Sequence, residues 1–205
     1  MFPTISIIPP KNKIYRRLGY RREITRLTPH QEKLTDSFIN EAASFITLKG
    51  AALRIPIVER ESNVILLAGD ICLKSAHLAS FLHDCTEALL VGATAGHDIV
   101  AATRENMKKN AVAKAAVFDA TASEMTDSAL GWLMDYYRRS LLRERKNILT
   151  KRYSAGYGDF ALENQRYFHA LLNLEAIDVR ITADNILLPE KSVTAITGIR
   201  DLEGH

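Results

Sequence analysis

The residue types most suited to chemistry lie in one short segment, 152–160 (RYSAGYGDF). Arg152 stands four positions before Gly156, and this glycine has Tyr153 and Tyr157 on either side. An arginine can pair with a carboxylate, a glycine lets the backbone approach a ligand closely, and tyrosine rings offer aromatic faces. The pattern therefore indicates a ligand site. A tight turn with Tyr157 in the core explains the same residues equally well.

Two other groups of residues could carry chemistry, but their spacing argues against it. Residues 92–96 (GATAG) follow an apolar run, yet they form neither a G-x-G-x-x-G nor a Walker pattern, so a simple strand-to-helix turn is favoured over phosphate binding. Cys72 and Cys85 lie near His77 and His83, but no Cys-x-x-Cys pair is present. We expect no metal site and interpret both thiols as core residues.

A basic cluster follows the longest apolar-periodic region. Its members are Arg138, Arg139, Arg143, Arg145, Lys146, Lys151 and Arg152. Cations near a helix C-terminus on a solvated face explain the cluster, and a docking surface for an acidic partner is the alternative.

Composition limits the functional class. The 205 residues are 47% hydrophobic, with a formal net charge of +3, which suits one domain over residues 1–205 and does not indicate nucleic-acid binding. No apolar run approaches the roughly 20 residues that span a bilayer, and the N-terminus lacks the pattern of a signal peptide. We therefore expect a cytoplasmic protein that does not associate with membranes.

The N-terminal half is predicted to alternate between helices and short strands. Residues 1–27 read as an extended arm and a basic segment, with a brief helix stopped at Gly19. A capping box with proline at the first helical position, TPHQ at 28–31, predicts a helix. Strands are expected at 51–58, 64–67 and 88–94, and helices at 75–85 and from 97 onward.

The C-terminal half is predicted to contain the longest helix, at 111–146, with a break near Ser123 or Gly131. A helix at 162–174 and strands at 179–182, 186–188 and 193–199 follow. Strands thus gather near both ends around long helices, so we predict an α+β fold with a mixed, partly antiparallel sheet.

Segment 152–157 resembles the Arg-x-x-x-Gly-Tyr signature of the activation (reactivation) domain of cobalamin-dependent methionine synthase, in a free-standing form. Residues 162–165 (LENQ), 182–188 and 189–198 (PEKSVTAITG) are similar to the C-terminal part of that domain. The resemblance is clearest over residues 119–199. It departs from the family at Gly158 and Phe160, where many relatives have proline at or near these positions.

The resemblance implies a site for S-adenosylmethionine. Arg152 would pair with the carboxylate of the methionine moiety, the backbone of Ser154, Ala155 and Gly156 would accommodate the ligand, and Tyr157 would wall the pocket. Glu124 corresponds to an acidic residue that would lie near the cationic end of the ligand. An exposed helix glutamate explains this residue equally well.

The resemblance also implies a cofactor and partners. Cobalamin would arrive on another chain, because the Asp-x-His-x-x-Gly pattern of cobalamin-binding domains is absent. This chain would support reductive methylation of cob(II)alamin on a separate methionine synthase subunit or other corrinoid protein, with a flavodoxin-like reductant supplying the electron. It would have no catalytic side chain of its own. The alternatives are a scaffold for a corrinoid protein that has lost ligand binding, and an independent small-molecule methyltransferase.

Overall fold

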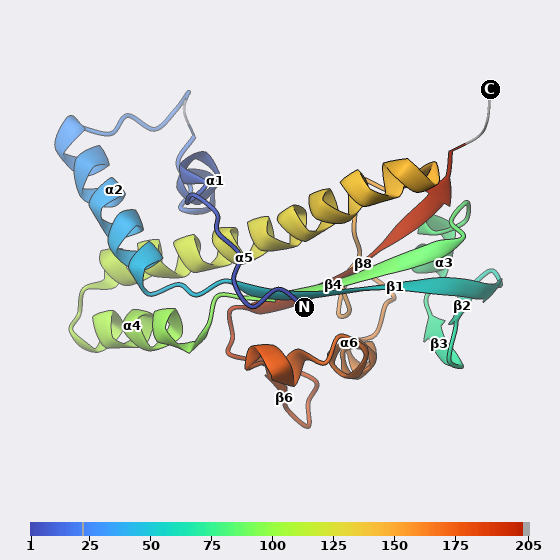
Figure 1. Cartoon of the computed structure of the whole chain (residues 1–205). Helices are drawn as coiled ribbons and strands as arrows, with labels where there is room; N and C mark the ends of the chain where they lie inside the picture. The colour runs from blue at the N-terminus through green and yellow to red at the C-terminus, as the bar shows by residue number, and fades with distance from the viewer. Residues whose placement is uncertain (22, 203–205) are drawn as a thin grey trace.

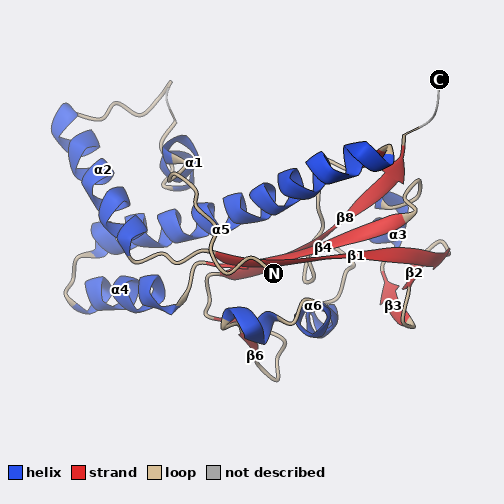
Figure 2. Ribbon diagram, in the orientation of Figure 1, coloured by secondary structure: helices blue, strands red, loops and turns tan. Residues whose placement is uncertain are grey.

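The computed structural model describes residues 1–21 and 23–202, and it confirms the α+β class. The main sheet has the order β3-β2-β1-β4-β8-β5, and every adjacent pair in it is antiparallel, so the sheet is more regular than the mixed one expected (Figures 1 and 2). Its strands are β1 (Lys49–Arg60), β2 (Val64–Leu67), β3 (Ile71–Lys74), β4 (Glu87–Thr94), β5 (Lys146–Ile148) and β8 (Ser192–Asp201).

Helices cover both faces of this sheet. The long helix α5 crosses one face, accompanied by α1, α2 and α4 (Figure 1). The other face carries α3, α6, two short 3-10 helices and a small β6–β7 hairpin. The bounds are α1 (Lys11–Arg17), α2 (Pro29–Ser44), α3 (Ala76–Phe81), α4 (His97–Lys108), α5 (Val112–Leu141), η1 (Leu142–Glu144), η2 (Leu162–Asn164), α6 (Gln165–Leu171), η3 (Leu174–Ile177), β6 (Arg180–Ile181) and β7 (Leu187–Leu188).

Strand β4 lies at the centre and separates two apolar cores. Because side chains alternate along a strand, Leu89 and Val91 pack on the α5 side, whereas Leu90 packs with Phe168 on the α6 side. All but the first residue of β4 are buried, which explains why the strand reads as a continuous apolar run in the sequence.

Local signals predict helix boundaries well where the cap is in the sequence. At the start of α2, the Thr28 hydroxyl accepts from the Gln31 backbone N–H (3.3 Å), and the Gln31 side chain accepts from the Thr28 N–H (2.9 Å). The predicted capping box is therefore confirmed. Gly19 follows α1 with φ of +87°, in agreement with the predicted helix stop.

The predicted break in α5 is wrong, because the helix runs without interruption through Ser123 and Gly131. A single glycine costs only about 1 kcal/mol in a helix interior, and the buried face of α5, which includes Phe118 and Leu133, outweighs that cost. The helix also ends earlier than residue 146. Arg145 has a left-handed φ of +54°, which turns the chain into β5.

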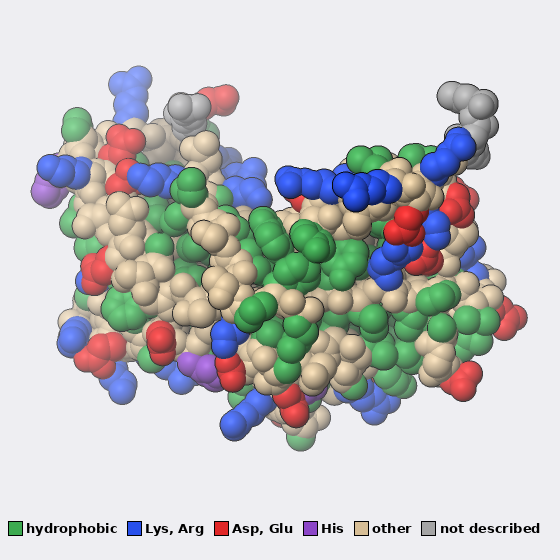
Figure 3. Space-filling model, viewed as in Figure 1, with side chains coloured by type: hydrophobic (Ala, Val, Ile, Leu, Met, Phe, Trp, Pro, Cys, Tyr) green, Lys and Arg blue, Asp and Glu red, His purple; other side chains and the backbone are tan. Residues whose placement is uncertain are grey.

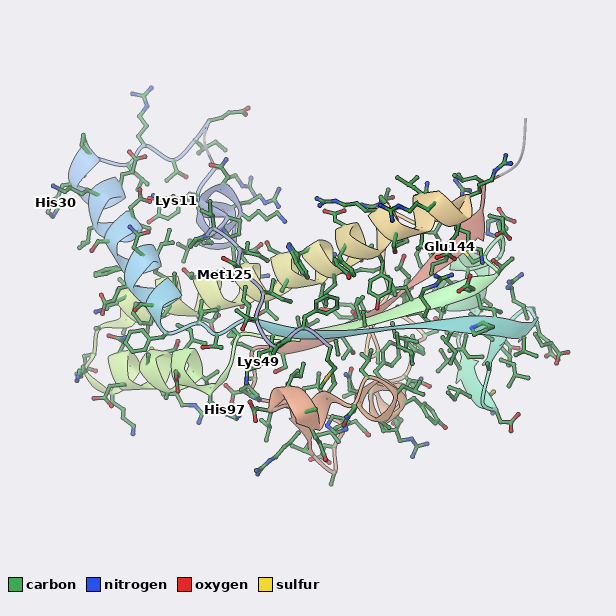
Figure 4. The ribbon with its side chains drawn as sticks, viewed as in Figure 1. Lys11, His30, Lys49, His97, Met125 and Glu144 are labelled. Carbon is green, nitrogen blue, oxygen red and sulfur yellow. The ribbon has the colours of Figure 1, made fainter. Side chains whose placement is uncertain are left out.

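Contacts at Asp178 fix the end of the α6 layer to the rest of the fold. Lys49 Nζ lies 2.5 Å from Asp178 Oδ2, and His97 Nε2 lies 3.3 Å from the Asp178 carbonyl oxygen. Lys49 and His97 are close to each other at this end of the sheet (Figure 4). None of the described helices is both long and apolar enough to cross a membrane.

Candidate functional site

A pocket of about 230 Å³ opens beside the first residues of β8. Three segments that are distant in the sequence surround it: the loop 154–157, the η2–α6 region and the turn between β6 and β7. Leu162, Ile186 and Leu187 supply apolar walls, and Gln165 and Glu190 supply polar groups. The pocket can therefore hold a ligand with both a flat apolar part and hydroxyl or amide groups.

The segment that begins at Arg152 is attached to β8 by backbone hydrogen bonds. Tyr153 and Ile196 exchange two N–H to C=O bonds of 2.8 Å each, and the Ser154 hydroxyl donates to the Thr194 carbonyl at 2.7 Å. The segment thus continues along β8 past the end of β5.

Two glycines then turn the chain back. Gly156 has φ of +89° and donates its N–H to the Phe160 carbonyl at 2.8 Å, and Gly158 has φ of +59°. Side chains other than glycine rarely adopt this backbone region, so the turn depends on both residues. The turn buries Phe160 completely and leaves the Tyr157 side chain 71% exposed at the pocket. The alternative with Tyr157 in the core is therefore wrong, and Phe160 takes that role.

Asp159 ties the loop to the start of helix α3. It accepts from the Ser75 hydroxyl at 2.5 Å and from the Ala76 backbone N–H at 2.7 Å. These hydrogen bonds, the one from Ser75 above all, hold the pKa of the Asp159 carboxyl below its usual value.

Asp159→Asn is expected to lower the melting temperature at neutral pH and to make little difference in strong acid. Because the folded-state pKa of Asp159 is depressed, its contribution to stability is present above the unfolded-state pKa and disappears as the pH falls through the folded-state pKa. Thermal unfolding of both proteins at pH 7 and pH 1.5 measures the effect. Asp184→Asn, at an exposed position, is the control. An equal loss of stability at both pH values would contradict this account.

Arg152 lies beside α5, outside the pocket lining. Its guanidinium is about one-quarter exposed and forms a salt bridge with Asp127 of α5. The same face of α5 reaches the start of β8, since Lys191 Nζ lies 2.9 Å from Ser123 Oγ and 2.7 Å from Asp119 Oδ1. The Arg152–Asp127 ion pair therefore lies between α5 and the loop segment whose next residues, from Ser154 onward, line the pocket.

Glu124 is directed elsewhere. It accepts from Arg17 of α1 at 2.6 Å and is mostly buried, so it is not the exposed helix glutamate that the sequence allowed as an alternative. It does not line the pocket. The acidic residue of α5 that contacts Arg152 is Asp127. It lies three residues after Glu124, so the two side chains are about one helical turn apart, and this spacing is the sequence signal that could have suggested Asp127.

The structure thus gathers part of the predicted site. Ser154, Ala155 and Tyr157 line the pocket, and Gly156 forms the turn between them. Sequence reasoning missed the other polar residues of the lining, which are Gln165, Asn185, Glu190, Ser192 and Thr194. They lie in LENQ, in 182–188 and in PEKSVTAITG, three segments that were noted for their resemblance but not as ligand contacts.

The polar groups of the pocket are fixed by neighbours. The Gln165 side-chain amide donates to the Thr194 hydroxyl at 2.7 Å, which leaves its carbonyl oxygen as an acceptor. Glu190 is about half exposed and accepts from Arg104 at 2.6 Å. No histidine, cysteine or lysine lines the pocket as described, and no group of three or more metal-ligating side chains occurs among the described residues. The arrangement is suited to binding a ligand and offers no nucleophile paired with a base.

Comparison with family models and with curated proteins gives no match. Comparison with solved structures finds the crystal structure of the MetH reactivation domain bound to AdoHcy, with a TM-score of 0.67 and 12% sequence identity. The alignment covers 96% of this chain and 74% of that chain. At this level of identity the likeness establishes a shared fold and nothing beyond it.

Proposed function

We propose that this chain, acting as one domain, binds S-adenosylmethionine beside Arg152 and serves as the reactivation subunit of a separate cobalamin-dependent methionine synthase. The observation that carries the proposal is the position of the Arg152–Tyr157 segment. Its residues Ser154, Ala155 and Tyr157 line a pocket in a fold shared with a reactivation domain bound to AdoHcy, the demethylated form of the same ligand.

The Arg152–Asp127 salt bridge offers a binding site for the amino-acid end of this ligand. The methionine moiety carries one carboxylate and one ammonium group, so it can insert between the two side chains and leave no charge unpaired. In this arrangement Asp127 receives the ammonium group. Glu124 is the alternative acidic contact, and it would first have to leave Arg17.

The pocket itself offers a binding site for the adenosine end of the ligand. Leu162 and Ile186 offer apolar surface to an adenine ring, and the exposed Tyr157 ring can close over it. Glu190 and Asn185 can bond to ribose hydroxyls, because a carboxylate or amide oxygen accepts from an O–H group. The pocket and the ion pair together match the two ends of S-adenosylmethionine.

The protein contributes positioning rather than a reacting side chain. It would hold the sulfonium methyl group toward a partner-bound cobalamin and keep water away from it. The partner's cobalamin, when reduced by one electron from a flavodoxin-like protein, would supply the acceptor for the methyl group, and S-adenosylhomocysteine would be left in the site beside Arg152.

A scaffold role without ligand binding is the second candidate. The specific observation that favours it is that Arg152 already has an internal partner in Asp127. If that salt bridge is too stable to open, the fold would persist and the ligand would be excluded.

We expect this chain to restore methylcobalamin on an inactive cob(II)alamin-bearing methionine synthase when S-adenosylmethionine and a reductant are present. The corrinoid absorbance spectrum of the partner measures the change, and omission of this chain is the control. Arg152→Ala should reduce the rate to that of the control, because the methyl donor is no longer held. Equal rates with and without the chain would remove the reactivation role, and a rate unaffected by Arg152→Ala would remove this site from it.

A further inference from the structure

The outer side of α5 carries a stripe of aromatic and cationic residues that the ligand pocket does not use. Trp132, Tyr136, Arg139 and Arg143 follow at spacings of four, three and four, which places them on one side of α5 and its continuation η1. Tyr136 is 51% exposed, and both arginines are exposed. We refer to these four residues as the α5 stripe.

The aromatic part of the α5 stripe is ordered by the N-terminal arm. The Phe2 ring packs edge-on against Trp132 and Tyr136, with centroid distances of 5.4 and 5.0 Å, while Trp132 and Tyr136 are stacked at 5.9 Å. Phe2 is itself fixed to β1 by paired backbone bonds with Gly50 at 2.8 and 2.9 Å. The partly buried Trp132 ring and the exposed Tyr136 ring are therefore held in place before any partner arrives, which lowers the entropy cost of binding.

The surface next to the α5 stripe is hollowed. Figure 3 shows hydrophobic side chains in a hollow over the middle of α5, with Lys and Arg side chains along the C-terminal half of the helix beside it. Leu142, 57% exposed, adds apolar surface next to the two arginines. Tryptophan, tyrosine and arginine at a pre-ordered apolar surface are the residues that contribute most to protein interfaces.

The charges on this surface are unbalanced. The nearby acids already have partners: Asp135 forms a salt bridge with Arg138, and Glu144, at the end of α5 (Figure 4), accepts from Arg54 at 2.8 Å. Within the described residues, neither Arg139 nor Arg143 forms a salt bridge. The surface thus offers two solvated cations with which carboxylates of another molecule can pair.

We propose that the α5 stripe is a docking surface for an acidic amphipathic helix of a partner protein. Carboxylates of the partner pair with Arg139 and Arg143, and its apolar face packs on Trp132 and Tyr136 beside the hollow over α5. A second copy of this chain would bring like charges together in a two-fold contact, and a flat bilayer would not follow a hollow. The inference is independent of the ligand pocket, because none of these residues lines it.

The single tryptophan of the chain lies in this stripe, so its fluorescence reports directly on occupation. The probes are two designed helical peptides of about 18 residues, or five turns, without tryptophan or tyrosine. Both carry the same leucine face, and one has glutamates where the other has lysines. The acidic peptide should saturably change Trp132 emission, and the basic peptide should not.

Charge-reversed variants separate this proposal from general attraction to a basic protein. The double variant Arg139→Glu with Arg143→Glu should raise the dissociation constant of the acidic peptide about tenfold or more. Lys74→Glu with Lys108→Glu, at exposed positions away from the stripe, makes the same change in net charge and should have little effect. Equal weakening by both pairs, or equal binding of both peptides, would overturn the proposal. Binding of phosphatidylglycerol vesicles with the same arginine dependence and more tightly than the acidic peptide would replace it with a membrane surface.

Discussion

Replacing Arg152 with alanine is expected to weaken binding of S-adenosylmethionine by about 2–5 kcal/mol, or roughly 30-fold to 5,000-fold. The loss is this large because the ligand carboxylate would enter a partly buried site without its cationic partner. Isothermal titration calorimetry of wild type and variant measures the change.

Two comparisons make the Arg152 result specific. Lys151→Ala removes the adjacent exposed cation and should leave the affinity nearly unchanged. If Asp127 receives the ammonium group, Asp127→Asn should lower the affinity for S-adenosylmethionine more than Glu124→Gln does. The reverse order would assign that role to Glu124. An Arg152→Ala affinity equal to wild type would exclude Arg152 from the site.

Phe160→Ala is expected to destabilise the fold by about 3–5 kcal/mol, the usual cost of truncating a buried phenylalanine. Phe160 is fully buried and packs edge-on against Phe168 at a centroid distance of 6.1 Å, so its removal leaves a cavity between the loop and α6. Urea unfolding monitored by circular dichroism gives the free energy of unfolding.

Phe45→Ala serves as the matched control for Phe160→Ala. Phe45 follows α2 and is 38% exposed, so the same truncation there should cost much less. If the two variants lose the same free energy of unfolding, the packing of the Gly156–Phe160 turn against α6 does not stabilise the fold as described.

Elements with a local signal were predictable from the sequence, and those that depend on distant partners were not. The capping box fixes the start of α2, and the apolar runs reveal β4 and β8. Strand β3 (Ile71–Lys74) was missed because it is formed through its pairing with β2. Strand β5 was missed because it was read as the end of α5, and the left-handed turn at Arg145 has no mark in the sequence.

The candidate site divides in the same way. The Arg152–Tyr157 segment stands out because its residue types and spacing are local. The roles of Asp127 and Glu190 could not be predicted from the sequence. Asp127 contacts Arg152 only because of the way α5 is rotated, and Glu190 reaches the pocket only because the β7–β8 connection packs beside loop 154–157. The partnership of Glu124 with Arg17 spans more than 100 residues and depends on how α1 packs on α5. Tertiary packing, rather than residue type, decides these contacts.

The most direct test of the proposed ligand site is a crystal structure of the chain soaked with S-adenosylhomocysteine, which cannot react. We predict density for the adenosine between Leu162, Ile186 and Tyr157, and density for the amino-acid end between Arg152 and Asp127 with their salt bridge opened. Ligand density at another place, or an empty pocket with the Arg152–Asp127 pair intact at saturating ligand, would contradict the proposed site and favour the scaffold.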